Sequence, residues 1–157
     1  MTQEKKFYLT LKGLEDIKKE YEELKKLRLL KTKGEAPKIL ESEDLNPEYI
    51  SFQEDLSFLE TRLVELEDII KNAVLIKPPS KENQNTIFLG AKVLVEIDGK
   101  DNDEFEIVGT IEANPFLGRI SNESPVGKAL LGHRSGDEII VSSPIKTIYK
   151  IKKIRYS

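Results

Sequence analysis

The stretch "NPEYISFQEDLSFLETRLVELEDIIKNA", residues 46–73, decides the fold of the first half of the chain. Its apolar residues recur in alternating steps of three and four, and they are Tyr49, Phe52, Leu56, Leu59, Leu63, Leu66, Ile70 and Ala73. This spacing is a heptad repeat, which puts one narrow apolar stripe along a helix. Asn46 can cap the first free amides, and Pro47 suits the first helical position. A stripe this narrow predicts that a second helix covers it.

The covering helix is predicted just before this stretch. Apolar side chains again follow steps of three and four, at Leu14, Ile17, Tyr21, Leu24, Leu27 and Leu30. Thr10 can cap this helix, and the pattern fades at Gly34 and Pro37, which both disfavour a helix interior. We therefore predict that the two helices fold back on each other as an antiparallel hairpin. A dimer of helices joined through the same stripes is the alternative.

The pattern changes in the second half of the chain. The segment "KPPSKENQN", residues 77–85, contains two prolines and no period, which indicates a linker. Beyond it, apolar residues tend to fall at every second position, in residues 87–97, 104–109, 137–142 and 147–154. A period of two is typical of strands with one buried face. Ser124 and Pro125 mark the start of a short helix and Gly132 its end. We predict a small antiparallel sheet with one short helix.

The composition excludes several classes of protein. Cysteine is absent from the 157 residues, which excludes disulfides and a thiol nucleophile. No apolar run reaches the length of a membrane span, and the N-terminus lacks the apolar core of a secretory signal. We therefore expect a cytoplasmic protein. The single histidine, His133, has no catalytic partner at a suitable spacing, and no phosphate-binding glycine loop occurs. We expect a protein that is not itself an enzyme.

Opposite charges gather at the break between the two predicted helices. Basic side chains lie on or just after the first helix, and they are Lys25, Lys26, Arg28, Lys31, Lys33 and Lys38. The acidic side chains Glu41, Glu43, Asp44 and Glu48 follow. A basic run is most often a solvated helix face, and it could also contact nucleic-acid phosphates. The acidic cluster repels phosphate, whereas it attracts a cation. These charges favour a cation as the target of the tip.

Several motifs together resemble a known family. The segments "YLTLKGLEDIKKEYEELK" (residues 8–25), "NPEY" (46–49) and "ISNESPVGKALLGHRSGDEIIV" (120–141) resemble the bacterial GreA/GreB transcript-cleavage factors, and GreA more than GreB. The resemblance implies an α+β fold. Residues 1–76 would form an antiparallel coiled-coil hairpin with an acidic tip, residues 77–85 a linker, and residues 86–157 an FKBP-like polymerase-binding domain. That domain would be a small antiparallel sheet with one short helix.

The resemblance also implies a function. The protein would be a monomeric transcription elongation factor that binds RNA polymerase, with no membrane contact. It would insert its coiled coil into the secondary channel and stimulate the polymerase's own cleavage of backtracked transcripts. It would need no cofactor of its own, because the Mg²⁺ belongs to the polymerase active site.

The resemblance assigns roles to residues. Asp44 and Glu43 would be the catalytic acids and the ligands of the second Mg²⁺, which is shared with the polymerase. The candidate polymerase contacts are Ser121, Asn122, Glu123, Ser124 and Pro125. The basic residues near the 3′ end of the nascent RNA would be Lys25, Arg28, Lys31 and Lys33.

The tip motif leaves an alternative open. The family pattern runs Gly-Asp-Leu-x-Glu-Asn-Ala-Glu-Tyr, whereas the matching block here, residues 44–49, is two residues shorter. A Gre-like regulator that occupies the channel without stimulating cleavage is therefore the second hypothesis. A prolyl isomerase, suggested by the FKBP-like half, and an unrelated coiled-coil adaptor are further alternatives. Fold alone does not carry activity, so an isomerase needs its own evidence from a proline-binding pocket.

Overall fold

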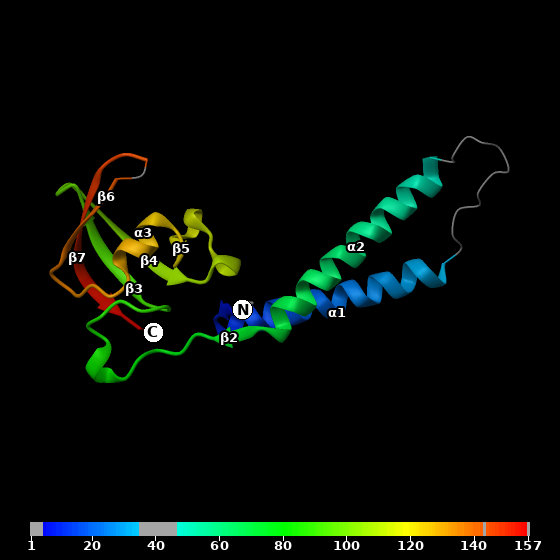
Figure 1. The fold of residues 1–157 in the computed structure, drawn as a ribbon, viewed down its shortest axis with the longest axis horizontal. Coiled ribbons are helices and arrows are strands. Elements are labelled where there is room, and N and C mark those ends of the chain that lie inside the picture. Colours follow the sequence, from blue (N-terminus) through cyan, green and yellow to red (C-terminus); the bar gives the residue numbers. More distant parts are fainter. Residues whose placement is uncertain (1–4, 35–46, 143, 157) are drawn as a thin grey trace. The chain divides into compact units, whose positions relative to one another are not determined.

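The computed structural model describes residues 5–34, 47–142 and 144–156 (Figure 1). The chain divides into two compact units. One unit combines Met1–Gly13 with Ala73–Ser157, and the other is Leu14–Asn72. None of the helices in the described part of the chain has both the length and the hydropathy of a membrane span.

The helical unit is a hairpin of α1 (Leu11–Lys33) and α2 (Pro47–Lys71). Arg62 pairs with Glu20, Tyr21 donates to Glu67, and Lys31 lies 3.5 Å from Asp55. Lys31 follows Glu20 and Tyr21 in α1, whereas its partner Asp55 precedes Arg62 and Glu67 in α2, so the helices run antiparallel. The predicted hairpin within one chain is confirmed. Thr10 caps α1, because its Oγ1 accepts from Gly13 N at 3.0 Å. The predicted cap Asn46 lies outside the described residues.

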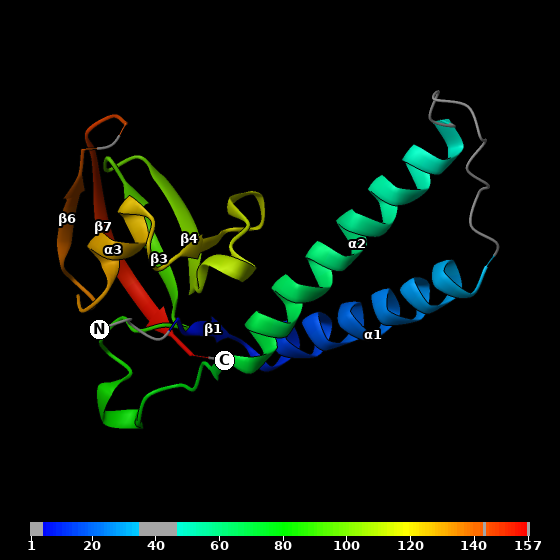
Figure 2. The same cartoon turned by 45° about the vertical axis from the view of Figure 1, so that its right-hand side comes forward.

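The apolar stripe of α2 is buried over only part of its length. Its buried residues are Leu59, Leu63, Leu66 and Ile69. The last buried residue of the stripe is Ile69, whereas the predicted Ile70 is only half-buried. The predicted last position of the stripe, Ala73, lies in a strand. At the other end of the hairpin Leu27 and Leu30 of α1 are exposed. The helices diverge toward residues 33 and 47 (Figure 2), and the apolar side chains of α1 and α2 are less buried there among the described residues.

The second unit contains two sheets. The short strands β1 (Phe7–Leu9) and β2 (Ala73–Leu75) pair in parallel. The larger sheet has the order β5-β4-β3-β7-β6, formed by Arg119–Ser121, Asp101–Val108, Lys92–Ile97, Thr147–Arg155 and Glu138–Val141. Strand β5 runs parallel to β4, so the sheet is mixed and the prediction of an antiparallel sheet was wrong in this respect. The chain reaches β5 through two 3₁₀ turns, Thr110–Glu112 and Pro115–Leu117, which let it return in the same direction.

One hydrophobic core holds this unit together. It contains Ile87, Ala91, Val93, Val95, Ile107, Leu130, Ile139, Val141 and Ile151. Leu130 comes from α3 (Pro125–Leu130), so the predicted short helix covers the buried face of the sheet. The alternation of Val93 and Val95 with Lys92 and Leu94 places the latter pair on the opposite face. Burial of these branched side chains is the main source of stability for the sheet.

The segment between the helices and the large sheet is tied down at both ends. Ile76 N donates to Leu9 O at 2.8 Å, directly after the parallel pair. Near the other end, the hydroxyl of Tyr156 donates to Thr86 O and accepts from Phe88 N. Between them, Lys81–Asn83 form one turn of 3₁₀ helix. The two bonds of Tyr156 join the residue after β7 to the segment just before β3.

Candidate functional site

The candidate polymerase contacts form one loop between β5 and α3. Ser124 caps α3, because its Oγ accepts from Gly127 N at 3.1 Å and donates to Ser121 O at 2.7 Å. Pro125 is the first helical residue, as predicted. A Cβ at position 127 would collide with the Ser121 carbonyl, so this tight turn requires glycine. The structure thus brings the five predicted residues together in a turn fixed by its own hydrogen bonds.

A second set of hydrogen bonds joins this loop to the turn after β4. Thr110 Oγ1 lies 2.8 Å from Ser121 Oγ and donates to Glu123 Oε2 at 3.0 Å. Glu123 N donates to Ser121 Oγ at 3.0 Å, and Asn122 N donates to Val108 O at 2.9 Å. Glu123 and Pro125 are exposed, whereas the other three candidates are half-buried. The loop therefore presents a carboxylate and a proline on a rigid frame.

A pocket of about 390 Å³ lies beside this loop. Asn122 and Glu123 line it together with residues from two other segments, namely Lys5, Lys6, Phe7, Tyr8, Gly109, Thr110 and Ile111. The sequence analysis missed these residues. The N-terminal strand and the loop are far apart in the sequence, and neither carries a periodic signal that would pair them. In the structure the N-terminal strand touches the turn after β4 at Gly109, where a Cβ would collide with the Tyr8 carbonyl.

Glu112 anchors the start of α1 to the same region. Its Oε2 accepts from Thr10 N and its Oε1 from Thr10 Oγ1, both at 2.6 Å. Arg119 donates to Oε1 at 3.0 Å, and the Glu112 side chain is only 7% exposed. A nearly buried carboxylate is stable only when charge and hydrogen bonds satisfy it, and here both do. Sequence reasoning identified the Thr10 cap but not its partner across the chain.

The predicted RNA-proximal basic residues do not share one face of α1. Lys25 lies over the Tyr21 ring, 5.1 Å from its centroid, and Lys31 is paired with Asp55. Arg28 and Lys33 are exposed and form no ion pair with any residue that the structure describes. At about 100° per residue, the four positions spread over more than half of the helix circumference. Two of the four charges are therefore available to a ligand.

Tyr21 and Arg62 bind the two helices to each other through charged partners. The hydrogen bond that the Tyr21 hydroxyl donates to Glu67 raises the pKa of Tyr21 above its ordinary value. The two bonds from Arg62 to Glu20, at 2.9 and 3.1 Å, likewise raise the pKa of the guanidinium. Both contacts join α1 to α2.

The predicted tip acids Glu43 and Asp44, with Glu41, lie outside the described residues. Glu48 lies in the first turn of α2 and is exposed, where a carboxylate interacts favourably with the helix dipole. No three histidine, aspartate or glutamate side chains within residues 5–34, 47–142 and 144–156 come close enough to hold a metal ion. The metal ligands predicted from the sequence therefore rest on the sequence alone.

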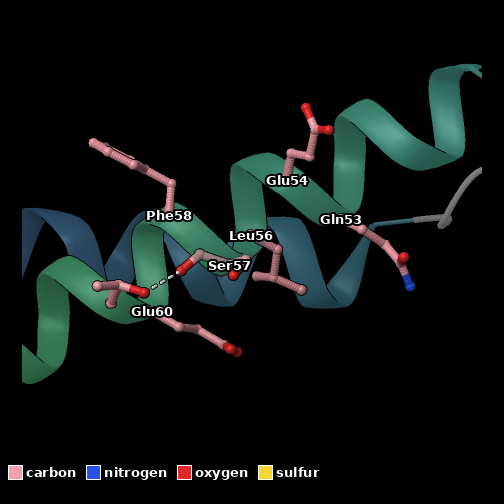
Figure 3. Close-up of a pocket in the computed structure, with 7 residues that line it drawn as sticks. Gln53, Glu54, Leu56, Ser57, Phe58 and Glu60 are labelled. Atoms are coloured by element: carbon pink, nitrogen blue, oxygen red, sulfur yellow. Dashed lines mark hydrogen bonds between the residues drawn. The ribbon is translucent and has the colours of Figure 1, made fainter.

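A concavity on α2 also lies near the divergent end of the hairpin (Figure 3). It is lined by one stretch of the helix, with Gln53, Glu54, Leu56, Ser57, Phe58, Glu60 and Thr61. Phe58 and Glu60 point to opposite sides of the helix, and Phe58 is 78% exposed. The bond from Thr61 Oγ1 to Ser57 O stays within the helix. A surface built from one helix, with its side chains diverging, does not enclose a ligand.

Comparison with known proteins covers both units. Residues 7–75 match the family model "Transcription elongation factor, N-terminal", and residues 81–156 match "Transcription elongation factor, GreA/GreB, C-term". The Transcription elongation factor GreA of Clostridium acetobutylicum is 43% identical over 150 residues, which cover 92% of each chain. That of Listeria welshimeri is 36% identical over 161 residues and covers 100% of both.

One solved structure is also similar. The crystal structure of GreA factor homolog 1 of Thermus thermophilus is 28% identical and covers 96% of this chain and 99% of that chain. Its TM-score of 0.42 is too low to support a comparison of the two folds. The two family matches span nearly the whole chain, and the two relatives match it over 92% and 100% of their own length. The chain therefore belongs to the GreA/GreB family of transcription elongation factors.

Proposed function

We propose that this protein binds RNA polymerase, inserts its helical hairpin into the secondary channel and stimulates the polymerase's own cleavage of backtracked transcripts. The observation that carries the proposal is the family match over residues 7–75 and 81–156, together with three carboxylates at positions 41, 43 and 44, which lie between the two helices in the sequence. The match supports the role in elongation, and the carboxylates supply the chemistry.

The proposed chemistry needs little from this chain. Mg²⁺ is a hard ion that takes one or two carboxylates and completes its shell with water and phosphate oxygens. In a two-metal site the ions activate the attacking water and stabilise the charge on the phosphate. Asp44 is the leading ligand for the second ion and Glu43 its helper. Glu48 is a weaker candidate, because a carboxylate in the first turn of a helix already interacts with the dipole.

The hairpin serves as the carrier of these acids. The 25 residues of α2 span roughly 37 Å at 1.5 Å per residue. Contacts between the helices at Arg62–Glu20, Tyr21–Glu67 and Lys31–Asp55 support the antiparallel arrangement along this length. Arg28 and Lys33, near the end of α1, carry the charge that would attract the RNA.

The loop at residues 121–125 is the proposed docking surface for polymerase. Its exposed Glu123 and Pro125 stand on a frame of hydrogen bonds, and the pocket beside Asn122 can receive a side chain of the partner. Changing Asn122 and Glu123 to lysine should weaken polymerase binding at least tenfold without unfolding the protein. Glu82→Lys, an exposed change in the 3₁₀ turn at 81–83, is the control. Equal affinity of the double variant and the control would remove this loop from the interface.

The experiment that tests cleavage follows transcript shortening in stalled, backtracked complexes as magnesium is varied. Asp44→Asn keeps the size of the side chain and removes the charge that the cation prefers. Cleavage should fall at least tenfold, equivalent to about 1.4 kcal/mol of barrier, and binding to polymerase should survive. More magnesium should restore part of the rate. Glu54→Gln, on the exposed surface of α2, is the matched control and should match the wild type.

A second function is favoured by one observation, the tip motif that is two residues shorter than the family pattern. In that case the protein occupies the channel and regulates polymerase without stimulating cleavage. The wild type would then bind polymerase and yet leave the cleavage rate unchanged at every magnesium concentration. If the wild type stimulates cleavage but Asp44→Asn and Glu43→Gln both match it, the acids that act lie elsewhere.

A further inference from the structure

The outer face of the large sheet carries a shallow basic pocket. It has a volume of about 200 Å³ and is lined by Lys92, Leu94, Glu104, Lys153 and Arg155. These residues come from three adjacent strands, β3, β4 and β7. Lys92 and Leu94 alternate with the buried Val93, so the pocket lies on the face turned away from the core. The lining therefore contains three cationic side chains, one leucine and one carboxylate.

The strand register forces these cations together. Lys92 is directly opposite Arg155, and Leu94 is directly opposite Lys153. The side chains at the directly opposite and diagonal positions of neighbouring strands are close enough to interact. Like charges at directly opposite positions destabilise a sheet. The directly opposite pair of Lys92 and Arg155, with Lys153 at the diagonal position, therefore costs stability when no ligand is bound.

The nearby carboxylates do not neutralise this charge. Glu104 is bound by Arg155 at 2.6 Å. Glu106, which is opposite Lys92 on the other side, lies 3.8 Å from the Nε of Arg119. Lys92 and Lys153 have no ion-pair partner among the residues that the structure describes. By contrast, Lys152 on the same strand lies 2.7 Å from Glu96. The unbalanced charge is thus a property of the pocket and not of the whole face.

We propose that this pocket binds one backbone phosphate of a nucleic-acid strand. Arginine and lysine side chains together provide the fork and the point charges that hold a phosphate. The lining contains no aromatic ring, so a nucleobase would find no stacking partner, which argues against a free nucleotide. The pocket is small and lies on an open sheet face, which suits a strand that passes over it. This inference goes beyond the proposed function, which requires no nucleic-acid contact on the sheet.

The first experiment locates binding by nuclear magnetic resonance on the full-length protein. A single-stranded ten-nucleotide DNA is titrated at low salt, and amide shifts are followed in β3 and β7. We expect shifts at residues 92–94 and 153–155, which disappear in a Lys92→Gln/Lys153→Gln variant. Inorganic phosphate is titrated in parallel. If inorganic phosphate shifts these amides and the oligonucleotide does not, the assignment to nucleic acid is overturned. If the oligonucleotide shifts only amides of α1, the pocket is not the binding site.

The second experiment measures affinity by fluorescence anisotropy of the same oligonucleotide over a range of salt concentrations. The double variant should bind about three- to tenfold more weakly at low salt. Its salt slope should be smaller by about 0.7, the value for one phosphate contact on a single strand. Lys100→Gln/Lys146→Gln removes the same charge from two exposed positions outside the pocket and is the control. Equal losses in both double variants would reduce the effect to net charge and overturn the proposal.

The third readout separates binding from a structural role. Because the cations repel each other, the Lys92→Gln/Lys153→Gln variant should have a Tm equal to or above that of the wild type when no ligand is present. Lys152→Gln, which breaks the pair with Glu96, should not raise the Tm. A lower Tm in the double variant would mean that these lysines stabilise the sheet, and the argument from unbalanced charge would fail.

Discussion

The two units of the molecule bury apolar side chains in different ways. In the sheet unit, nine apolar residues from the strands, α3 and the segment before β3 form one core, and most are completely buried. In the hairpin, α2 buries four apolar residues and α1 buries none from Leu14 onward. A sheet covered by a helix encloses its core from several directions, whereas two helices cover each other only along one line. The hairpin is therefore sensitive to the distance between its helices at every turn.

This difference has a functional side. Segments with few buried contacts open at low free energy, and segments that must move or enter another molecule are drawn from this class. In the second half of α2, Leu59, Leu63 and Leu66 are buried. Toward the divergent end of the hairpin, Leu27 and Leu30 of α1 are exposed. We expect stability to decline along the hairpin, and the predictions below test this decline against the sheet unit.

The largest effect is expected from truncating the buried stripe. Leu66 is 0% exposed and Leu30 is 70% exposed. Leu66→Ala should lower the free energy of unfolding by about 2–5 kcal/mol, because it removes buried methyl groups and leaves a cavity. Leu30→Ala should change it by no more than about 0.5 kcal/mol. Urea denaturation followed by circular dichroism measures both. Equal losses would show that the divergent part is as well packed as the base.

A smaller loss is expected where α1 begins. Glu112→Gln keeps the shape but weakens the charge-assisted bonds to Thr10 and Arg119, and should cost about 1–3 kcal/mol. Glu123→Gln changes the same charge on an exposed side chain and is the control, with an expected change within about 0.5 kcal/mol. Thermal unfolding of the two variants gives the comparison. If Glu112→Gln matched the control, the first turn of α1 would not depend on this carboxylate.

The ion pairs between the helices should contribute less. Arg62 and Glu20 are each more than one-third exposed, so water and salt weaken their attraction. Arg62→Gln should cost about 0.2–1 kcal/mol at low salt, and the loss should shrink at 1 M salt. Chemical denaturation at both salt concentrations tests this. A salt-independent loss would mean that the aliphatic part of Arg62, and not its charge, supports the hairpin.

The smallest expected effects are on how stability depends on pH, and they have opposite directions in the two units. In the sheet unit, the hydrogen bond from Lys152 lowers the pKa of Glu96 below its ordinary 4.5. Its stabilisation is present above that value and is lost as the pH falls through the lowered pKa. In the hairpin, the pKa of Tyr21 is raised above 10.0 by its bond to Glu67. That stabilisation is present below 10.0 and is lost as the pH rises through the raised pKa.

Two variants measure these opposite dependences. Glu96→Gln should flatten the acid side of the stability curve, and Tyr21→Phe the alkaline side, in denaturant titrations at a series of pH values. Each variant should leave the other side unchanged, since the two groups lie in different units. If Tyr21→Phe left the alkaline side of the curve unchanged, the tyrosine hydroxyl would not be the group that sets it.

Local patterns in the sequence predicted the elements but not how they meet. Heptad steps identified α2, and the hydroxyl of Thr10 and that of Ser124 identified two helix starts. The parallel pairing of β1 with β2 joins residues more than sixty positions apart, and no local signal encodes it. The same holds for the bond of Glu112 to Thr10 and for the pocket beside Asn122. Within α2, the heptad pattern predicted Ile70 in the stripe, whereas Ile69 is the buried residue and Ile70 is half-buried.

The candidate sites divide along the same line. The family resemblance selected residues 121–125 as candidate contacts, and their capping signals predicted a helix start at Ser124 and Pro125, which the structure confirms. The basic pocket on the sheet was not predicted, since its residues look like ordinary solvated charges until the register brings β3 and β7 together. The tip acids Asp44 and Glu43 stay a prediction.

The contact between Gly13 and Glu112 also constrains how this protein can diverge. A Cβ at position 13 would occupy the space of the Glu112 carboxylate, so a larger residue there requires either a displaced carboxylate or a shorter residue at position 112. A shorter residue at 112 would in turn lose its reach to Thr10 and Arg119. Positions 13 and 112 should therefore covary among related sequences. A chain that gains a side chain at the first and keeps glutamate at the second must either move that carboxylate out of its bonds with Thr10 and Arg119 or move the start of its first long helix.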